Sequence, residues 1–176
     1  MEYLRLSWQD IEEQCKELAR EIKNRGVDFD IIIALARGGW VPGRLLSDYL
    51  DNDELYTVRV KFYVGVGKRR KEPLILHPTQ FTIRGKKVLL VDDIADTGES
   101  LLVALRHIRD RGADGIFVAT LVKKPHSKFV PDLFVIETPA WVVFPWEVKE
   151  TIKSLGDVEE IRKAGITEEE YYSLDF

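Results

Sequence analysis

The sequence predicts an α/β fold with a mainly parallel central sheet that is flanked by helices. Short, fully apolar runs such as 31–35 and 88–91 are typical of buried strands, and segments with apolar residues at helical spacing alternate with them. Strands that alternate with helices form parallel sheets, because each crossover helix packs on a face of the sheet. The chain has 176 residues and is 45% hydrophobic, so it has about the length of one domain and can bury a sizeable core.

Three helices are predicted from the helical spacing of apolar residues. The first begins near Ser7, which together with Asp10 resembles a helix start, and it ends at Gly26. The second begins near Pro42, because proline is favoured in the first helical turn. The third covers 98–111.

The predicted strands are short and either fully apolar or alternating. The segment 56–62 alternates apolar and polar residues as a half-exposed strand does, and 74–76 is predicted as the return strand of a hairpin. The other strands are expected at 31–35, 88–91, 116–122 and 133–136. The basic turn 68–71 between the hairpin strands is interpreted as a solvated tip. The stretch after residue 147 is acidic and helical in pattern.

The composition argues against several functional classes. The single cysteine, Cys15, excludes a disulfide framework, and the histidines His77, His107 and His126 do not fall at metal-ligand spacings. A net charge of −4 argues against a protein that binds nucleic acid through bulk electrostatics. No apolar run approaches the roughly 20 residues of a membrane-spanning helix, and the first residues lack the pattern of a secretory signal. We therefore expect a cytoplasmic protein that binds neither nucleic acid nor membranes.

The most informative stretch is the end of the strand at 88–91 and the loop that follows it. Asp92 and Asp93 come directly after four apolar residues, at the carboxyl end of a buried strand. Adjacent carboxylates repel each other, so they suit a place where a divalent cation or sugar hydroxyls compensate their charge. The following loop, 96–100, opens a helix, and its backbone N–H groups and hydroxyls can hold a phosphate.

Each of these residues alone is more simply explained as part of an ordinary strand-to-helix turn. Asp96 or Thr97 would then be a helix N-cap. The joint pattern Asp-Asp-x-x-Asp-Thr-Gly is more specific, because its chance occurrence in a chain of this length is on the order of 10⁻⁴.

This segment resembles the phosphoribosyl-pyrophosphate (PRPP) signature of the type I phosphoribosyltransferases. The resemblance implies that Asp92 and Asp93 serve the ribose hydroxyls and magnesium-bound PRPP. It also implies that the 5′-phosphate is bound by Ala95, Asp96, Thr97, Gly98, Glu99 and Ser100. In purine-salvage members the acid that matches Asp96 faces N7 of the base and is the proposed general acid/base.

A second glycine-bearing loop follows the strand at 31–35. Two glycines and an arginine at a strand end suit an anion that approaches the backbone closely, although a plain tight turn explains them equally well. Together with 41–43, this loop resembles the pyrophosphate loop of bacterial xanthine-guanine phosphoribosyltransferases. The resemblance implies pyrophosphate binding by Ala36, Arg37, Gly38 and Gly39, and we predict a cis peptide bond between Ala36 and Arg37. A nucleotide P-loop is excluded, because Arg44 and Leu45 replace its Lys-Ser/Thr pair.

The base-binding residues are expected at 123–125 and 141–147. An indole is a platform for a flat heterocycle and a lysine can donate to a 6-oxo group, although core tryptophans and solvated lysines are the simpler explanation. The stretch resembles the base-binding part of the xanthine-guanine enzymes. The resemblance implies that Lys124 binds the purine, that Trp141 stacks on it and that Val142 offers backbone groups. Lys123 is the alternative to Lys124, and Glu147 is a further candidate for a metal or for pyrophosphate.

The family places a mobile lid over PRPP, usually with a Ser-Tyr pair. This chain has Phe62 and Tyr63 there, so Tyr63 is the candidate lid residue.

Together these features predict a purine-salvage transferase that joins a 6-oxopurine (hypoxanthine, guanine or xanthine) to PRPP with Mg²⁺, releasing pyrophosphate and a nucleoside 5′-monophosphate. The resemblance further implies a small hood, a homodimer or larger oligomer, and a domain of residues 1–147 that carries a helical acidic extension, 148–176. The alternatives are a PRPP- or nucleotide-sensing regulator of the same fold, a transferase for another base such as adenine or orotate, and an assembly subunit with a decayed site.

Overall fold

The chain forms two compact units. The computed structural model describes residues 1–64, 71–77 and 81–173. Residues 13–138 form one unit, which we call the sheet unit; residues 1–12 and 139–176 form the other, which we call the terminal unit. The expected domain boundary after residue 147 stays a prediction.

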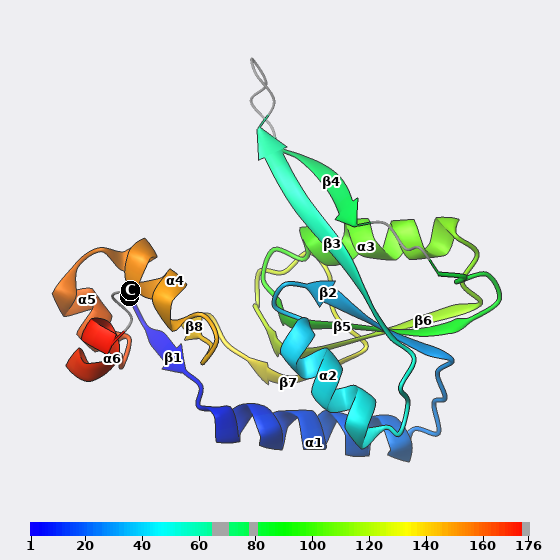
Figure 1. The fold of residues 1–176 in the computed structure, drawn as a ribbon, viewed down its shortest axis with the longest axis horizontal. Coiled ribbons are helices and arrows are strands. Elements are labelled where there is room, and N and C mark those ends of the chain that lie inside the picture. The colour runs from blue at the N-terminus through cyan, green and yellow to red at the C-terminus, as the bar shows by residue number, and fades with distance from the viewer. Residues whose placement is uncertain (65–70, 78–80, 174–176) are drawn as a thin grey trace. The chain divides into compact units, whose positions relative to one another are not determined.

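A mainly parallel sheet forms the sheet unit. Within the described residues it has six strands in the order β4-β3-β2-β5-β6-β7 (Figure 1). The strands are β2 (Ile31–Ala36), β3 (Leu55–Val64), β4 (Lys71–His77), β5 (Lys87–Ala95), β6 (Gly115–Lys123) and β7 (Leu133–Glu137). Neighbouring strands are parallel except β3 and β4, which form the predicted antiparallel hairpin. The predicted fold class is confirmed.

The apolar strands are buried because helices cover both faces of the sheet. The helices are α1 (Trp8–Asn24), α2 (Trp40–Tyr49) and α3 (Glu99–Asp110), and Figure 1 shows α2 and α3 on opposite sides of the strands. Alternate residues of β2, including Ile31 and Ile33, share a core cluster with Leu101 of α3. On the other face Gly43 of α2 lies so close to β2 that a Cβ atom there would be 2.8 Å from Ala34 Cβ.

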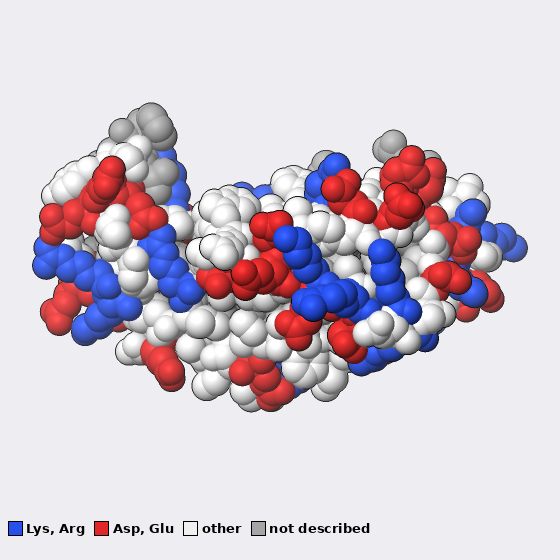
Figure 2. Space-filling view, turned by 90° about the horizontal axis from the view of Figure 1, so that it is seen from below, with Lys and Arg blue, Asp and Glu red and all other residues white. Residues whose placement is uncertain are grey.

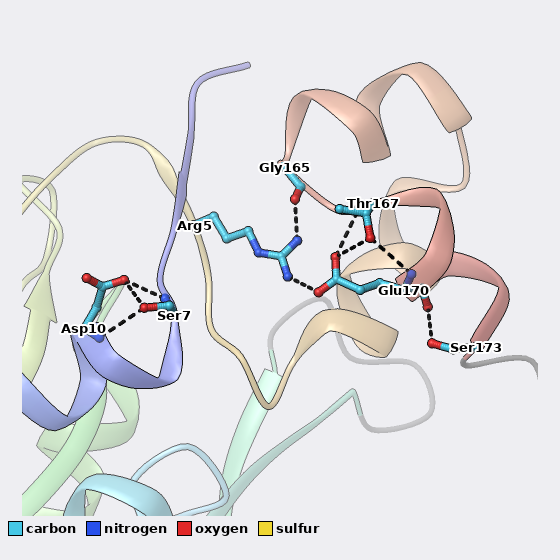
Figure 3. Close-up of polar contacts among 7 residues, drawn as sticks. All are labelled: Arg5, Ser7, Asp10, Gly165, Thr167, Glu170 and Ser173. Atoms are coloured by element: carbon cyan, nitrogen blue, oxygen red, sulfur yellow. Dashed lines mark hydrogen bonds and ion pairs between the residues drawn. The ribbon is translucent and has the colours of Figure 1, made fainter.

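Helix α1 begins where the sequence predicts it, and local side-chain hydrogen bonds stabilise its first turn. Ser7 Oγ accepts a hydrogen bond from the Asp10 backbone N–H at 3.1 Å, and Asp10 Oδ2 accepts one from the Ser7 N–H at 2.7 Å (Figure 3). The Ser7 hydroxyl also donates to Asp10 Oδ2 at 2.6 Å, and this bond and the one from the Ser7 N–H lower the pKa of the Asp10 carboxyl group. Gly26, which follows the helix, has φ 63°, a left-handed conformation typical of a helix end.

The terminal unit joins the two ends of the chain. Strand β1 (Tyr3–Arg5) pairs in parallel with β8 (Trp141–Val143), and neither strand was predicted. The helical prediction after residue 147 is confirmed by α4 (Val148–Leu155), α5 (Val158–Lys163) and α6 (Glu168–Ser173). Arg5 donates to the Gly165 carbonyl at 2.5 Å and pairs with the Glu170 carboxylate (Figure 3). A core that includes Val143 and Ile161 lies within this unit.

Two features bear on binding to membranes and nucleic acid: the hydropathy of the described helices and the distribution of charge on one face. Among the described helices none combines the length and hydropathy needed to cross a bilayer. On the face drawn in Figure 2, Lys and Arg side chains lie interspersed with Asp and Glu side chains.

Candidate active site

Two loops with the predicted binding residues meet at one edge of the sheet. Strands β2 and β5 are parallel neighbours, so the loops that follow their carboxyl ends lie side by side. The first loop contains residues 37–39 and the second residues 96–98. The peptide bond between Ala36 and Arg37 is cis, as predicted.

One cavity of about 420 Å³ is shared by these loops. It lies within the sheet unit, and three segments of the chain line it. The first loop contributes Ala36, Arg37 and Gly38, the β5–α3 segment contributes Asp92, Asp93, Asp96, Thr97, Gly98, Glu99 and Ser100, and β3 contributes Val60 and Phe62. Of the predicted pyrophosphate and sugar-phosphate residues, all but Gly39 and Ala95 therefore line one space. Their roles in binding remain a proposal.

Glycines let the two loops approach each other and the sheet. A Cβ atom on Gly38 would lie 2.1 Å from Asp93 Oδ2, and one on Gly39 would lie 2.4 Å from the Val91 carbonyl oxygen. Gly98 has φ 78°, and a Cβ there would lie 2.8 Å from the Phe129 backbone nitrogen. Because such distances are far inside van der Waals contact, a larger residue at any of these positions must displace the neighbouring backbone or carboxylate.

The paired acids lie at the end of β5 with little solvent exposure. Asp92 is 9% exposed and Asp93 5% exposed, and Asp92 Oδ1 accepts a hydrogen bond from the Asp93 N–H at 3.0 Å. Among the described residues no group of three or more His, Cys, Asp or Glu side chains is placed to hold a metal. A cation here would be held by one or two carboxylates and by oxygens of a phosphorylated ligand. That is the usual coordination of Mg²⁺ in proteins, so the residues fit this ion.

The first turn of α3 lies where the sequence predicts a phosphate site. Its N-cap residue is Gly98, which has no side chain that could accept a hydrogen bond from the helix amides. Thr97 Oγ1 accepts a hydrogen bond from the Glu99 N–H at 3.3 Å. The positive end of the helix dipole points to this turn, which favours an anion. Helix α3 therefore presents its amino end to the cavity.

The two lysines at the end of β6 have different surroundings. Lys123 Nζ pairs with Glu137 Oε2 at 3.1 Å across β6 and β7, and it lies 5.5 Å from the centre of the Phe134 ring. Lys124 follows the strand, is 6% exposed, and interacts electrostatically with Asp96. Burial lowers the pKa of Lys124, while the Asp96 carboxylate acts in the opposite direction. Of these two lysines, Lys124 is therefore the one that interacts with Asp96.

The other predicted base-binding residues belong to the terminal unit. Trp141 is 44% exposed and its backbone N–H donates to the Glu2 carbonyl at 2.8 Å, whereas Val142 is buried. Glu147 precedes α4 as its N-cap residue. The roles of these three residues in purine or metal binding stay predictions. The backbone of Tyr63 lies in β3, but its side chain and the turn 65–70 are outside the described part of the structure, as is the proposed lid.

Three residues near the loops were not assigned to the site from the sequence. Val60 and Phe62 line the cavity, and their spacing of two residues on a half-exposed strand is the signal that could have indicated them. His126 Nε2 lies 3.1 Å from Asp96 Oδ1. A contact between two loops that follow different strands has no signature in the local sequence.

One other cavity and the cysteine thiol do not suit this chemistry. A larger cavity of about 570 Å³ lies at the amino end of β3, but its lining includes Asp48, Asp51 and Asp53, which would repel a phosphate. Cys15 is fully buried, and burial raises the pKa of its thiol to about 12. The thiol is therefore not a nucleophile at neutral pH.

Comparison with known proteins identifies the family of this chain. Residues 6–152 match the family described as phosphoribosyl transferase domain. The chain belongs to this family of glycosyltransferase-type enzymes, as the loop motifs predicted.

Individual relatives specify the similarity further. The chain is 30% identical over 146 residues to the xanthine-guanine phosphoribosyltransferase of Nitratidesulfovibrio vulgaris, covering 81% of this chain and 83% of that protein. The crystal structure of a purine phosphoribosyltransferase from Pyrococcus horikoshii matches with a TM-score of 0.76 and 36% identity, over 83% of this chain and 94% of that one. A hypothetical protein from Neisseria gonorrhoeae with bound ppGpp matches with a TM-score of 0.76 and 27% identity, over 94% of this chain and 97% of that one.

Proposed function

We propose that this protein transfers the 5-phosphoribosyl group of PRPP to a 6-oxopurine and releases pyrophosphate. The observation that carries the proposal is the single cavity that the Arg37–Gly38 loop and the Asp92–Ser100 segment line together. A donor that carries a phosphate at one end and a pyrophosphate at the other needs two anion-binding loops with a sugar site between them. The relatives named as xanthine-guanine and purine phosphoribosyltransferases support the same reaction.

Each part of PRPP has a matching part of the cavity. The 5′-phosphate would lie at 95–100, against the amides of the first turn of α3 and the hydroxyl groups of Thr97 and Ser100. The ribose hydroxyls would be bound by Asp92 and Asp93. The pyrophosphate would lie against the loop that contains Arg37, because the glycines allow close contact between its oxygens and the backbone.

In the transfer, the purine nitrogen forms a bond to C1′ as the bond from C1′ to the pyrophosphate oxygen breaks. The sugar develops positive charge, which the carboxylates of Asp92 and Asp93 stabilise. Asp96 accepts the proton that the purine loses at N7, since a carboxylate within hydrogen-bond reach can act as a general base. Bound Mg²⁺, held by Asp92 and Asp93, would stabilise the negative charge of the leaving pyrophosphate.

The proposed contacts of the base rest on the resemblance of 123–125 and 141–147 to the xanthine-guanine enzymes. Lys124 donates to the 6-oxo group, and its preference over Lys123 is supported by the Lys123–Glu137 ion pair. Trp141 stacks on the purine, and the backbone of Val142 contacts its edge. Glu147 is a possible additional group for the metal or the pyrophosphate. We further propose that the enzyme acts in the cytoplasm as a homodimer or larger oligomer, with Tyr63 in the lid.

A panel of bases incubated with PRPP and Mg²⁺, and read by pyrophosphate release, tests the proposed reaction. We expect release with hypoxanthine, guanine or xanthine and much less with adenine or orotate. Formation of the nucleoside 5′-monophosphate in equal amount must accompany it. Release with orotate or adenine alone would replace the proposed substrate class, and absence of release with every base would contradict the enzymatic proposal.

A nucleotide-sensing protein is the second candidate function. The ppGpp-bound neighbour from Neisseria gonorrhoeae favours it, because the match covers nearly all of both chains. Titration calorimetry with ppGpp distinguishes the two functions. A sensor would bind ppGpp tightly and show no turnover with any base, whereas an enzyme would show turnover whether or not ppGpp binds.

A further inference from the structure

The segment 124–129 after β6 is bonded to the proposed phosphate loop at several points. The Lys124 N–H donates to the Ala95 carbonyl at 2.9 Å, and the Lys128 N–H donates to the Thr97 carbonyl at 3.0 Å. Lys128 Nζ pairs with Glu99 Oε1 at 2.8 Å. These contacts hold the two segments in register, so a side chain on one of them has a defined position relative to the other.

The side chain of His126, which lies in this segment, contacts Asp96, the proposed general base. Its Nε2 lies 3.1 Å from Asp96 Oδ1. Because an ionised carboxylate only accepts hydrogen bonds, Nε2 is the donor in this contact. The contact engages one of the two oxygens of Asp96.

Asp96 needs such a contact because little else restricts its side chain. The side chain is 60% exposed, and an exposed aspartate can occupy several rotamers of similar energy. A general base works only when its oxygen is held within hydrogen-bond reach of the proton that it accepts. The charge of Lys124 also interacts with the Asp96 carboxylate.

We propose that His126 is a positioning residue for Asp96, whose Nε2–H holds Oδ1 so that Oδ2 accepts the purine proton. This inference rests on the proposed purine transfer, since it assigns His126 a role in that reaction. The contact lies at the surface, and His126 is itself 63% exposed. Exposed pairs commonly contribute little, so the expected effect is moderate.

A double-mutant cycle on turnover separates this role from a structural one. We expect His126→Ala to lower kcat about 3- to 10-fold, the range for loss of one ordinary hydrogen bond, because solvent weakens this exposed contact to a charged group. The KM for PRPP should stay within about twofold, because the other contacts of segment 124–129 remain. In the Asp96→Ala background the same change should have no effect, because His126 acts only through Asp96.

The conservative variant His126→Gln is the matched control. Its side-chain amide can donate a hydrogen bond, so it should restore most of the lost kcat, while thermal unfolding confirms that all variants fold. An unchanged kcat in His126→Ala, an additive cycle, or a change confined to the KM for PRPP would each overturn the positioning role. None of these results would contradict the proposed function, because the wild-type protein would still show turnover. A wild-type protein without turnover on any base would overturn the proposed function and the role of His126 with it.

Discussion

The α-carbon of Gly38 lies so close to the carboxylate of Asp93 that a Cβ atom would be 2.1 Å from Oδ2. Gly38 follows β2 and Asp93 lies near the carboxyl end of β5, so their contact brings the first loop against the paired acids. A side chain at position 38 has no room unless one of the loops moves. The proposed pyrophosphate and ribose sites can therefore lie this close together only because residue 38 has no Cβ atom.

Gly38→Ala tests this packing. We expect the KM for PRPP to rise about 10-fold or more, because a displacement on the order of 1 Å at a binding loop has large effects. The measurement is steady-state kinetics with PRPP varied at saturating base. Gly115→Ala is the matched control, since a Cβ at Gly115 meets nothing within 4 Å. A KM for PRPP that is the same in both variants would show that the first loop does not bind the donor.

Lys124 and Lys123 are expected to fail in different ways when they are replaced. Lys124→Met should raise the KM for the base and leave thermal stability nearly unchanged. Lys123→Met should leave the kinetics intact but lower the melting temperature by about 2–5 °C, because it leaves Glu137 without its partner. Kinetics and thermal unfolding of both variants check this. The reverse pattern would assign the base contact to Lys123.

The lowered pKa of Lys124 predicts an early loss of base binding at alkaline pH. Burial disfavours the ammonium form, so the charge is lost at a lower pH than for an exposed lysine. As pH rises through this pKa, the affinity for a 6-oxopurine should fall. The KM for the base should be followed with pH in the wild-type protein and in Lys124→Arg, which keeps its charge. The ionisation of the base is common to both proteins, so identical profiles would contradict the role of the ammonium group.

Trp141→Ala tests the proposed stacking platform in the terminal unit. Loss of one base–aromatic contact should raise the KM for the base about 5- to 100-fold, with a much smaller change in the KM for PRPP. Trp8→Ala is a suitable control, because Trp8 lies in the same unit and is also exposed. A larger effect on PRPP than on the base would exclude stacking at Trp141.

The sequence was sufficient to predict the sheet and the position of the two loops that line the cavity. Buried strands such as 88–91 are continuous apolar runs, and the polar residues that end them must lie at the open edge of a parallel sheet. The short strands β1 and β8 were missed. They have three residues each and pair Tyr3 with Trp141, so neither has a local pattern long enough to identify it.

The alternative between Lys123 and Lys124 depended on tertiary structure. Strand alternation predicts that the two side chains face opposite ways, but it does not say which lysine forms an ion pair with a residue of the neighbouring strand. That depends on the register of β6 with β7, which places Glu137 beside Lys123. The contact between His126 and Asp96 was beyond prediction for the same reason.

A crystal structure of the protein with a purine nucleoside 5′-monophosphate and Mg²⁺ tests the central claim most directly. We expect the 5′-phosphate against the backbone of 97–100 and the ribose hydroxyls beside Asp92 and Asp93. A nucleotide bound elsewhere, with this loop in contact only with water, would contradict the account.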